Sequence, residues 1–254
     1  MKLKETNNLL VSKKEHKYMK SLDKVQLNPF EGGILTTNNY FLLQNGKTQG
    51  FFVMDTDDKN SNYDTAYAVT TNPLINFACP RSLFTIKSYE KNLSAKDIAE
   101  STEKQQVVYG QKIVIMSHDS NCENNLYLFS SLLSPQNYSR FSRCQEVLVS
   151  TELGYNSVWS IEHVDTTLRF SLEGKPVNIN EPFVLKHCST NRLLASDMID
   201  YYNDYGNEYE VCCNNFLTNN KYQALCSEKE GRMKIDTKTR LEKEQNIWFV
   251  IDQF

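Results

Sequence analysis

The chain has 254 residues, of which 40% are hydrophobic and 23% are charged, and this ordinary globular composition excludes a disordered or coiled-coil protein. Its formal net charge is −3, so it carries no overall basic field that would hold a nucleic-acid backbone. No apolar run approaches the roughly 20 residues of a membrane span, and Met1-Lys2-Leu3-Lys4 leads into polar residues, so we expect neither a membrane anchor nor a secretory signal.

Residues 1–30 are the basic end of the chain, with seven lysines before residue 25. The pattern Ser12-Lys13-Lys14-Glu15 matches a capping box and predicts a helix from about residue 13 to 22. We expect an arm that lies on a surface, either of this domain or of a partner, and a frayed terminus is the alternative. The expected partner contacts in this arm are Lys13, Lys14 and Lys17.

From residue 31 to 254 we expect a single all-β domain, because short β-forming runs recur along it. The runs form three sets, each of which opens on an apolar stretch and closes on an aromatic residue. The openings, at residues 41–43, 113–115 and 183–185, are 72 and 70 residues apart. The closing aromatics are Phe84, Trp159 and Trp248, which are 75 and 89 residues apart.

This repetition predicts a β-trefoil-like barrel of three four-strand units, about residues 34–90, 107–165 and 176–252, whose closing aromatics share one core. Asn45-Gly46 predicts a tight hairpin turn in the first unit. Because the units are long, the prediction needs one or two short helices, such as one from about 94 to 103, and long loops. The expected loops are 55–65, 87–106, 130–143, 197–207 and 214–246. A Greek-key sandwich is the alternative architecture.

The third unit contains the polar turn His187-Cys188-Ser189-Thr190-Asn191-Arg192. His187 and His118 follow the openings of their sets at similar distances, which indicates a repeated structural turn and not a catalytic base. We expect Asn191 and Arg192 to order this turn. Tyr201, Tyr202 and Tyr205 follow in a predicted loop, where they either form a docking spot for a partner or fold back over the barrel mouth.

The candidate chemical motifs are incomplete. The acidic stretch that starts at Asp55 begins like a calcium loop, but Asn60 replaces the required glycine and Ala66 the last carboxylate. His187, Cys188, Cys212 and Cys213 could suggest a zinc set, yet adjacent cysteines on a strand point to opposite faces. The seven cysteines are therefore expected to be reduced cytosolic thiols. Without a nucleophile elbow or a phosphate loop, we expect no catalytic, cofactor-binding or metal-binding residues and no enzyme activity.

A series of short motifs in a fixed order resembles the cilia- and flagella-associated protein 161 family. The matching pieces are Val108-Tyr109-Gly110-Gln111, Leu126-Tyr127-Leu128, Gln145-Glu146-Val147, Leu172-Glu173-Gly174, His187 to Arg192, Tyr205-Gly206-Asn207-Glu208 and Asn246-Ile247-Trp248. The resemblance runs from about Ile34 to the C-terminus.

The resemblance implies a structural microtubule inner protein without catalytic activity or cofactor. Such a protein binds the luminal face of the α/β-tubulin lattice in ciliary doublet microtubules, beside other inner proteins, and supports ciliary motility. The implied location is the axoneme, with no nucleic-acid or membrane partner. The alternative function is a soluble trefoil module that binds sugars or phosphates, although the repeats lack a Gln-x-Trp signature.

Overall fold

The computed structural model describes residues 2–60, 62–63, 65–91, 95–117, 125–219, 221–232 and 241–252. In these ranges the chain is mostly β. The strands are β1 (Tyr40–Asn45), β2 (Phe51–Lys59), β3 (Ala66–Asn72), β4 (Phe84–Ser88), β5 (Lys112–Ser117), β6 (Leu126–Ser130), β7 (Gln145–Ser150), β8 (Trp159–His163), β9 (Phe183–His187), β10 (Leu194–Asn203), β11 (Gly206–Cys213) and β12 (Trp248–Ile251). The α-helices are α1 (Lys2–Ser21), α2 (Ala95–Glu100), α3 (Arg169–Leu172) and α4 (Lys221–Lys229). Short 3₁₀ turns are η1 (Glu31–Gly33), η2 (Pro80–Ser82), η3 (Tyr155–Ser157) and η4 (Glu244–Asn246).

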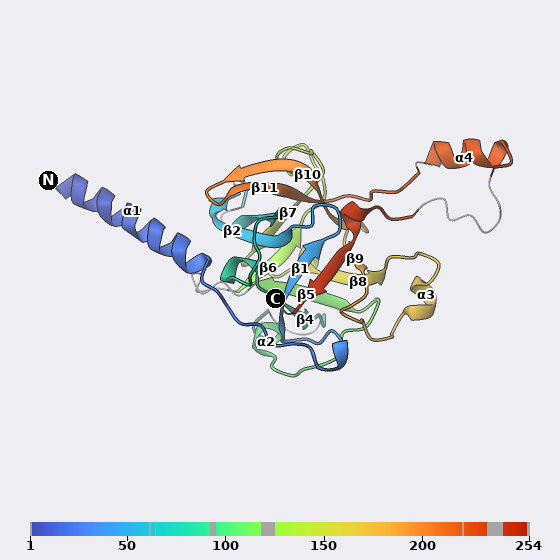
Figure 1. Ribbon diagram of the computed structural model, residues 1–254, viewed down its shortest axis with the longest axis horizontal. Helices are drawn as coiled ribbons and strands as arrows, with labels where there is room; N and C mark the ends of the chain where they lie inside the picture. The colour runs from blue at the N-terminus through green and yellow to red at the C-terminus, as the bar shows by residue number, and fades with distance from the viewer. Residues whose placement is uncertain are drawn as a thin grey trace.

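The sheet closes on itself through antiparallel pairs. One circuit runs β1–β4–β5–β8–β9–β12 and returns to β1. The hairpins β2–β3, β6–β7 and β10–β11 pair with one another through β3, β7 and β11. We call these three hairpins the cap. They lie together toward the upper side of the barrel in Figure 1, and closure of the sheet leaves few unpaired strand edges. The prediction of an all-β barrel is confirmed.

The closing aromatics lie in one hydrophobic cluster at the centre of the barrel. Phe84, Trp159 and Trp248 are each no more than 1% exposed and belong to the same cluster of buried residues. The indole N–H of Trp159 donates to the carbonyl of Leu128 at 2.9 Å, and that of Trp248 donates to the carbonyl of Leu194 at 3.0 Å. Both ring nitrogens are therefore satisfied inside the core, as burial of an indole requires.

The boundaries of several predicted elements were wrong. The predicted loop 197–207 forms most of the hairpin β10–β11, because the β-forming tyrosines of this stretch pair across a short turn, and β2 continues into the predicted loop 55–65 as far as Lys59. The arm helix α1 begins at Lys2, so Ser12 lies inside it and not at its start. The helix expected at 94–103 is the shorter α2, and α4 lies within the loop expected at 214–246.

Gly50 lies where the turn after β1 approaches the end of β3. A Cβ atom on Gly50 would lie 3.0 to 3.2 Å from three backbone atoms of Asn72, which cannot move without disturbing the β2–β3 ladder. Gly50→Ala is expected to lower the free energy of unfolding by about 1–3 kcal/mol, as overpacking does.

Urea unfolding followed by tryptophan fluorescence measures this loss. The matched control is Gly154→Ala, since Gly154 is exposed and a Cβ there would meet no atom within 4 Å. Equal stability of the two variants would contradict the packing argument.

Candidate partner interface

The arm helix α1 contacts the barrel at its C-terminal end. Lys17 forms an ion pair with Asp57 at 2.6 Å, and the ring of Tyr18 stacks on Tyr205 with centroids 4.8 Å apart. The hydroxyls of Ser21 and Tyr205 are hydrogen-bonded at 2.9 Å, and Ser21 is buried. We call these five residues the anchor. They fasten the last turn of α1 to the tips of the cap hairpins.

Tyr205 of the anchor lies on a buried ion pair. The guanidinium of Arg81 lies 3.5 Å from the centroid of the Tyr205 ring, a cation–π contact. The same guanidinium donates to both carboxylate oxygens of Glu208, at 2.7 and 3.2 Å. Arg81 and Glu208 are 2% and 0% exposed. A planar, fully buried cation therefore supports the ring that receives α1.

The carboxylate of Glu208 has further donors in the cap. It accepts hydrogen bonds from the hydroxyl of Thr70 and from the side-chain amides of Asn72 and Asn203. Burial by itself would raise the pKa of Glu208, but the Arg81 charge and these donors together hold the pKa below its ordinary value. The carboxylate is thus ionised and fully satisfied, which is the condition for a stable buried charge.

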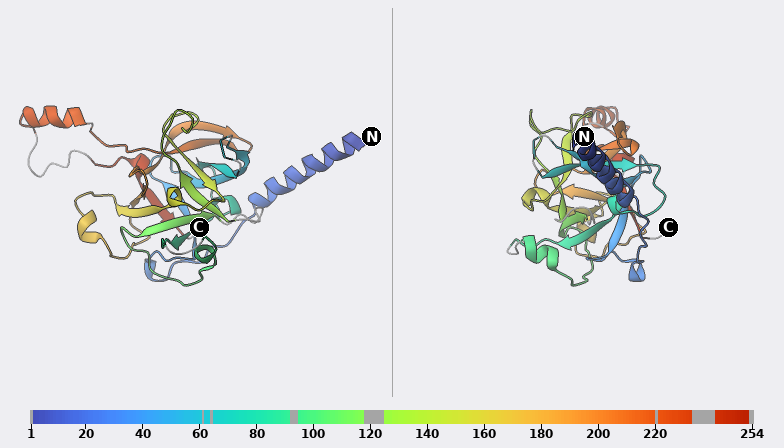
Figure 2. Two further views of the ribbon diagram at one scale, coloured as in Figure 1. Left: turned by 180° about the vertical axis from the view of Figure 1, so that it is seen from behind. Right: turned by 90° about the vertical axis from the view of Figure 1, so that its left-hand side faces the viewer.

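Beyond the anchor, α1 projects from the barrel (Figures 1 and 2). At 1.5 Å per residue, a helix of 20 residues is about 30 Å long. On this projecting part Val11 is 54% exposed, and Lys13 and Lys14 are exposed. An isolated helix of roughly 15 residues is marginal in water, so the anchor contacts help to stabilise α1.

The predicted partner contacts are distributed unequally. Lys13 and Lys14 lie on the projecting part of α1, whereas Lys17 belongs to the anchor. Tyr202 is 72% exposed and available to a partner. Tyr201 is only 5% exposed, and Tyr205 is half-buried in the anchor. Of the two alternatives, the folded-back arrangement therefore holds for Tyr201 and Tyr205, and the three tyrosines do not form one exposed docking spot.

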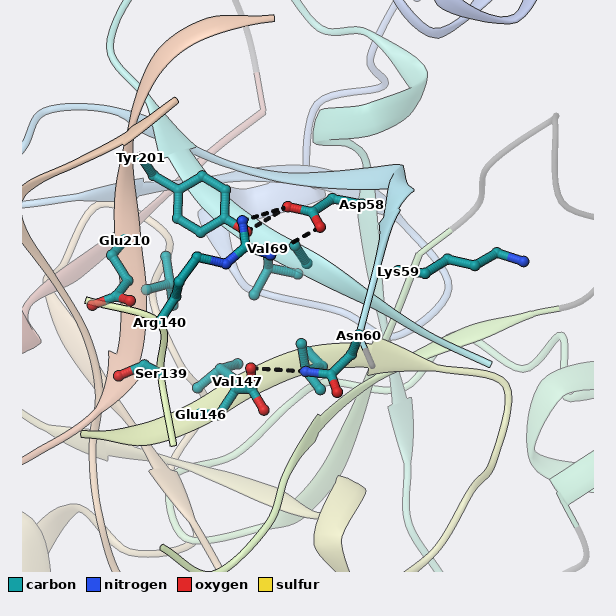
Figure 3. Close-up of a pocket in the computed structure, with 13 residues that line it drawn as sticks. Asp58, Lys59, Asn60, Val69, Ser139, Arg140, Glu146, Val147, Tyr201 and Glu210 are labelled. Atoms are coloured by element: carbon teal, nitrogen blue, oxygen red, sulfur yellow. Dashed lines mark hydrogen bonds and ion pairs between the residues drawn. The ribbon is translucent and has the colours of Figure 1, made fainter. Parts of the chain in front are cut away.

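A small cavity lies between the cap hairpins (Figure 3). Its volume is about 30 Å³, enough for about one water molecule. On one side Asp58 accepts from the Tyr201 hydroxyl and from the guanidinium of Arg140. On the other side Asn60 donates to Glu146 at 2.8 Å. Polar contacts between different hairpins thus close the centre of the cap.

Two ionisable groups of this cavity are perturbed. Burial raises the pKa of Glu146 to about 7, against the lowering effects of Asn60 and Arg140. The pKa of the Tyr201 hydroxyl is raised, first by burial and then by its hydrogen bond to Asp58. Two aspartates of the acidic stretch that resembled a calcium loop form ion pairs: Asp57 with Lys17 of the anchor, and Asp58 with Arg140 at the cavity. Residues 61 and 64 of that stretch lie outside the described ranges.

The turn that contains His187 is held in place by hydrogen bonds of its side chain and backbone. The His187 Nε2–H donates to the carbonyl of Asn156 at 2.9 Å, because a carbonyl can only accept, and its Nδ1 accepts from Thr190 at 2.8 Å. His187 is fully buried, and burial lowers its pKa. Asn191 adopts a left-handed φ of 55° and donates its N–H to the carbonyl of His187, while the carbonyl of Arg192 accepts from the N–H of His187.

The turn after β1 has a similar backbone arrangement with other side chains. The N–H of Asn45 donates to the carbonyl of Gly50, and Gln49 adopts the same left-handed φ of 55° as Asn191. The Asn45 side-chain amide donates to the carbonyl of Ile247, next to Trp248. The expected two-residue turn at Asn45-Gly46 is therefore a longer one. His118 lies outside the described residues.

Three residues that determine how α1 is held were not predicted from the sequence: Arg81, Glu208 and Asp57. One signal was present: Glu208 and Glu210 are two apart in a strand, so both carboxylates point to one face. Among the described residues, no group of three His, Cys, Asp or Glu is placed to hold a metal ion. No helix in the described ranges is both long and apolar enough to cross a bilayer.

The sequence model of the cilia- and flagella-associated protein 161-like domain matches residues 66–226, more than half of the chain. The chain belongs to the cilia- and flagella-associated protein 161 family. It is therefore associated with cilia and flagella. The match includes the His187 turn and the Arg81–Glu208 pair, but it excludes α1.

Curated members of the family are similar over part of their length. Cilia- and flagella-associated protein 161 of Danio rerio is 34% identical over 98 residues, which cover 38% of this chain and 32% of the relative. The Mus musculus protein is 34% identical over 145 residues, which cover 56% of this chain and 45% of the relative. The matched segment thus spans less than half the length of these relatives.

Solved structures outside the family share the fold. The SDF2-like protein from Arabidopsis thaliana matches with a TM-score of 0.57 and 20% identity, over 86% of this chain and 95% of that protein. A Caenorhabditis elegans protein of unknown function matches with a TM-score of 0.56 and 14% identity, over 88% of this chain and 99% of that protein. At these identities the likeness concerns the fold alone.

Glu208→Gln is expected to lower the free energy of unfolding by about 3–5 kcal/mol, because it leaves the Arg81 cation buried without its counter-charge. The control is Glu152→Gln, which neutralises an exposed carboxylate. Urea unfolding at pH 7 compares the two. Because the pKa of Glu208 is lowered on folding, its contribution is present above about pH 4.5 and is lost as the pH falls through the lowered value. A loss no larger than that of the control would contradict the role of the pair.

The raised pKa of Glu146 predicts that its contribution to stability has the opposite pH dependence. Its pKa rises on folding from 4.5 to about 7, so within this window the folded chain binds a proton that the unfolded chain has released. The contribution of Glu146 to stability therefore decreases as the pH rises from about 4.5 to 7. Glu146→Gln is expected to flatten this decrease in the free energy of unfolding. An unchanged pH profile in the variant would assign the slope to other groups.

Proposed function

We propose that this chain is a structural, non-enzymatic microtubule inner protein. In this proposal the barrel lies on the luminal face of the tubulin lattice of ciliary doublet microtubules, and α1 and the exposed loop side chains contact tubulin and neighbouring inner proteins. The observation that carries the proposal is a helix that is fastened to the barrel by its last turn and projects beyond it, in a chain that belongs to a cilia- and flagella-associated family.

The charge distribution supports a partner for α1. Residues 1–24 contain seven lysines and three carboxylates, whereas the whole chain has a net charge of −3. The positive charge is therefore concentrated on the arm, and it fits a protein surface that carries carboxylates. Because the acidic tubulin tails are outside the microtubule, a luminal protein does not need a basic body.

The barrel also has exposed side chains suited to a permanent lattice. Large apolar or aromatic side chains are exposed on four separate parts of the chain: Leu132 after β6, Phe170 on α3, Tyr202 on β10 and Tyr222 on α4, at 70%, 90%, 72% and 74%. Aromatic side chains form strong contacts in interface cores. In a repeating polymer, several modest contacts of one chain add through avidity. The helices α1 and α4 extend to opposite sides (Figure 2), which lets one chain reach two neighbours.

We also infer that the barrel is a β-trefoil of three four-strand units. Each unit contributes two strands to the closed circuit and one hairpin to the cap. Two similarities support a threefold repeat. The turns at Asn45 and His187 have matching backbone hydrogen bonds, and the indole N–H groups of Trp159 and Trp248 both donate to a backbone carbonyl. A superposition of the three units in an experimental structure tests this.

A structural role also accounts for the groups that resembled catalytic ones. Both ring nitrogens of His187 are used by the turn, and Asp57 and Asp58 are used in ion pairs. The ligand-binding alternative would use a hollow of about 330 Å³ beside β8 and α3. Its cations Arg169 and Lys186 are both paired with Glu162, so none of the described residues that line this hollow offers a free cation to a phosphate.

A density map of intact doublet microtubules tests the proposed location. We expect density for the barrel against the luminal wall, with α1 on a neighbouring protein, and retention of the chain in demembranated axonemes washed with moderate salt. Release by that wash together with an empty lumen would refute the proposal.

The arm variant Lys13→Glu with Lys14→Glu tests the contact itself. We expect weaker retention in axonemes, by at least about tenfold if reversal of two charges costs about 1.4 kcal/mol or more, and an unchanged melting temperature. The control, Lys91→Glu with Lys104→Glu, changes the net charge equally at exposed sites of the barrel. Quantitative immunoblots of washed axonemes measure both, and equal loss in the control would exclude a specific arm contact.

A further inference from the structure

The hollow of about 330 Å³ beside β8 and α3 is built from three parts of the chain. The strands β8 and β9 contribute Glu162 and Lys186, the turn before β5 contributes Gly110, and α3 with the residue after it contributes Arg169, Phe170 and Glu173. Its volume is at the small end of ligand pockets, so it fits a single side chain of a partner.

The cations that line this hollow are already paired. Glu162 pairs with Lys186 and, at 3.0 Å, with Arg169, which also pairs with Glu242 at 3.1 Å. The Nδ1 of His163 accepts from a backbone N–H at 3.0 Å, as in the neutral ring. An incoming anion would have to displace one of the bound carboxylates, so the hollow does not suit a phosphate or a carboxylate group.

Glu173 differs from the other charged groups of the hollow. It is exposed, and within the described part of the chain no cation forms an ion pair with it. Its side chain lies against Gly110, where a Cβ atom would be 3.1 Å from the Glu173 Cγ. Phe170, three residues earlier and therefore a neighbour on the surface of α3, is 90% exposed. An unpaired carboxylate beside an open aromatic ring is suited to bind an ammonium or guanidinium group.

The chain carries cations of this kind on its other side. Lys13 and Lys14 are exposed on the projecting part of α1, and no ion pair between described residues uses either of them. The helices α1 and α3 lie on opposite sides of the barrel (Figures 1 and 2). Because the anchor directs α1 away from the barrel, the arm of one chain cannot reach the hollow of the same chain, whereas the arm of a second chain can.

We propose that this hollow receives the side chain of Lys13 or Lys14 from the arm of a second copy of this chain. The proposal rests on the function proposed above, in which α1 contacts a neighbour, and it names that neighbour. The two surfaces of the contact differ, so each copy uses its arm for one neighbour and its hollow for another. A head-to-tail contact of this type builds an open linear array when its rotation does not close a ring, and such an array fits a protein that repeats along a polymer.

Sedimentation equilibrium of the purified full chain measures the contact without tubulin. We expect the apparent mass to rise above the 29.4 kDa of one chain as the concentration increases, and to fall again when salt screens the charges. A mass of one chain at all concentrations up to about 1 mM, the effective concentration that tethering on a lattice supplies, would overturn the proposal. That result would leave the luminal location intact, because the location is measured in doublet microtubules.

Charge reversal separates the two surfaces. Glu173→Lys is expected to weaken self-association at least about tenfold, whereas the control Glu152→Lys changes an exposed carboxylate that does not line the hollow and is expected to associate normally. Mixing the Glu173→Lys chain with a chain that carries Lys13→Glu and Lys14→Glu leaves one working arm and one working hollow. We therefore expect dimers and no longer species. Equal association of Glu173→Lys and its control, or a mixture that stays monomeric, would contradict a head-to-tail contact.

A cross-linking measurement needs no variant. A carbodiimide activates a carboxylate, and an amine in contact with it then forms an amide as the urea leaves. In a mixture of unlabelled chains and chains labelled with heavy nitrogen, we expect peptides in which Glu173 of one label is joined to Lys13 or Lys14 of the other. Mass spectrometry identifies these pairs. Glu173 linked only within a single label, or not linked to the arm at all, would refute the proposed contact.

Discussion

The contact between the barrel and its arm depends on one buried carboxylate. Glu208 lies on β11, Arg81 on the short turn η2 before β4, and the two meet under Tyr205 at the tip of the cap. An apolar pair of the same volume would often be as stable as a buried ion pair. It would not offer Tyr205 a flat, oriented cation, however, and the Tyr205 ring is the surface on which Tyr18 stacks. The ion pair therefore positions the Tyr205 ring, and this role is separate from any contribution of the pair to stability.

This positional role has a consequence for the direction of α1. Three kinds of contact at adjacent helix positions, the ion pair of Lys17, the stacked ring of Tyr18 and the hydroxyl of Ser21, fix both the rotation and the tilt of the last turn. A straight helix transmits that orientation along its axis, so Lys13 and Lys14 leave the barrel in a defined direction. An arm with a defined direction loses less entropy on binding than a free terminus does. The lattice contact proposed above would use this advantage.

The features of the fold that could be predicted from the sequence are those that are local or that recur along the chain. Trp159 and Trp248 were found because apolar runs precede them at similar spacing, and their indole bonds to Leu128 and Leu194 are equivalent. Phe84 belongs to the same buried cluster but has no N–H to donate, and a pattern of aromatic residues cannot reveal that difference. The ion pair beneath Tyr205 could not be predicted, because Arg81 and Glu208 are 127 residues apart and each has the sequence context of an ordinary surface charge. Which of the tyrosines fold back could not be predicted for the same reason: Asp58 and Ser21, the partners of Tyr201 and Tyr205, are 143 and 184 residues away.

The cap explains why so many polar groups are buried in a barrel with an apolar centre. Its three hairpins come from distant parts of the chain and meet through only a few ladder pairs, such as Tyr209 with Thr71 and Cys212 with Glu146. Polar side chains supply the remaining contacts: Glu210 accepts from the loop before β7, and Asn60 reaches Glu146. Such bonds have strict geometry, so they specify the register of hairpins that apolar packing alone would leave free to slide. A raised pKa at Glu146 follows from this arrangement, because the same burial that makes the bonds specific also desolvates the carboxylate.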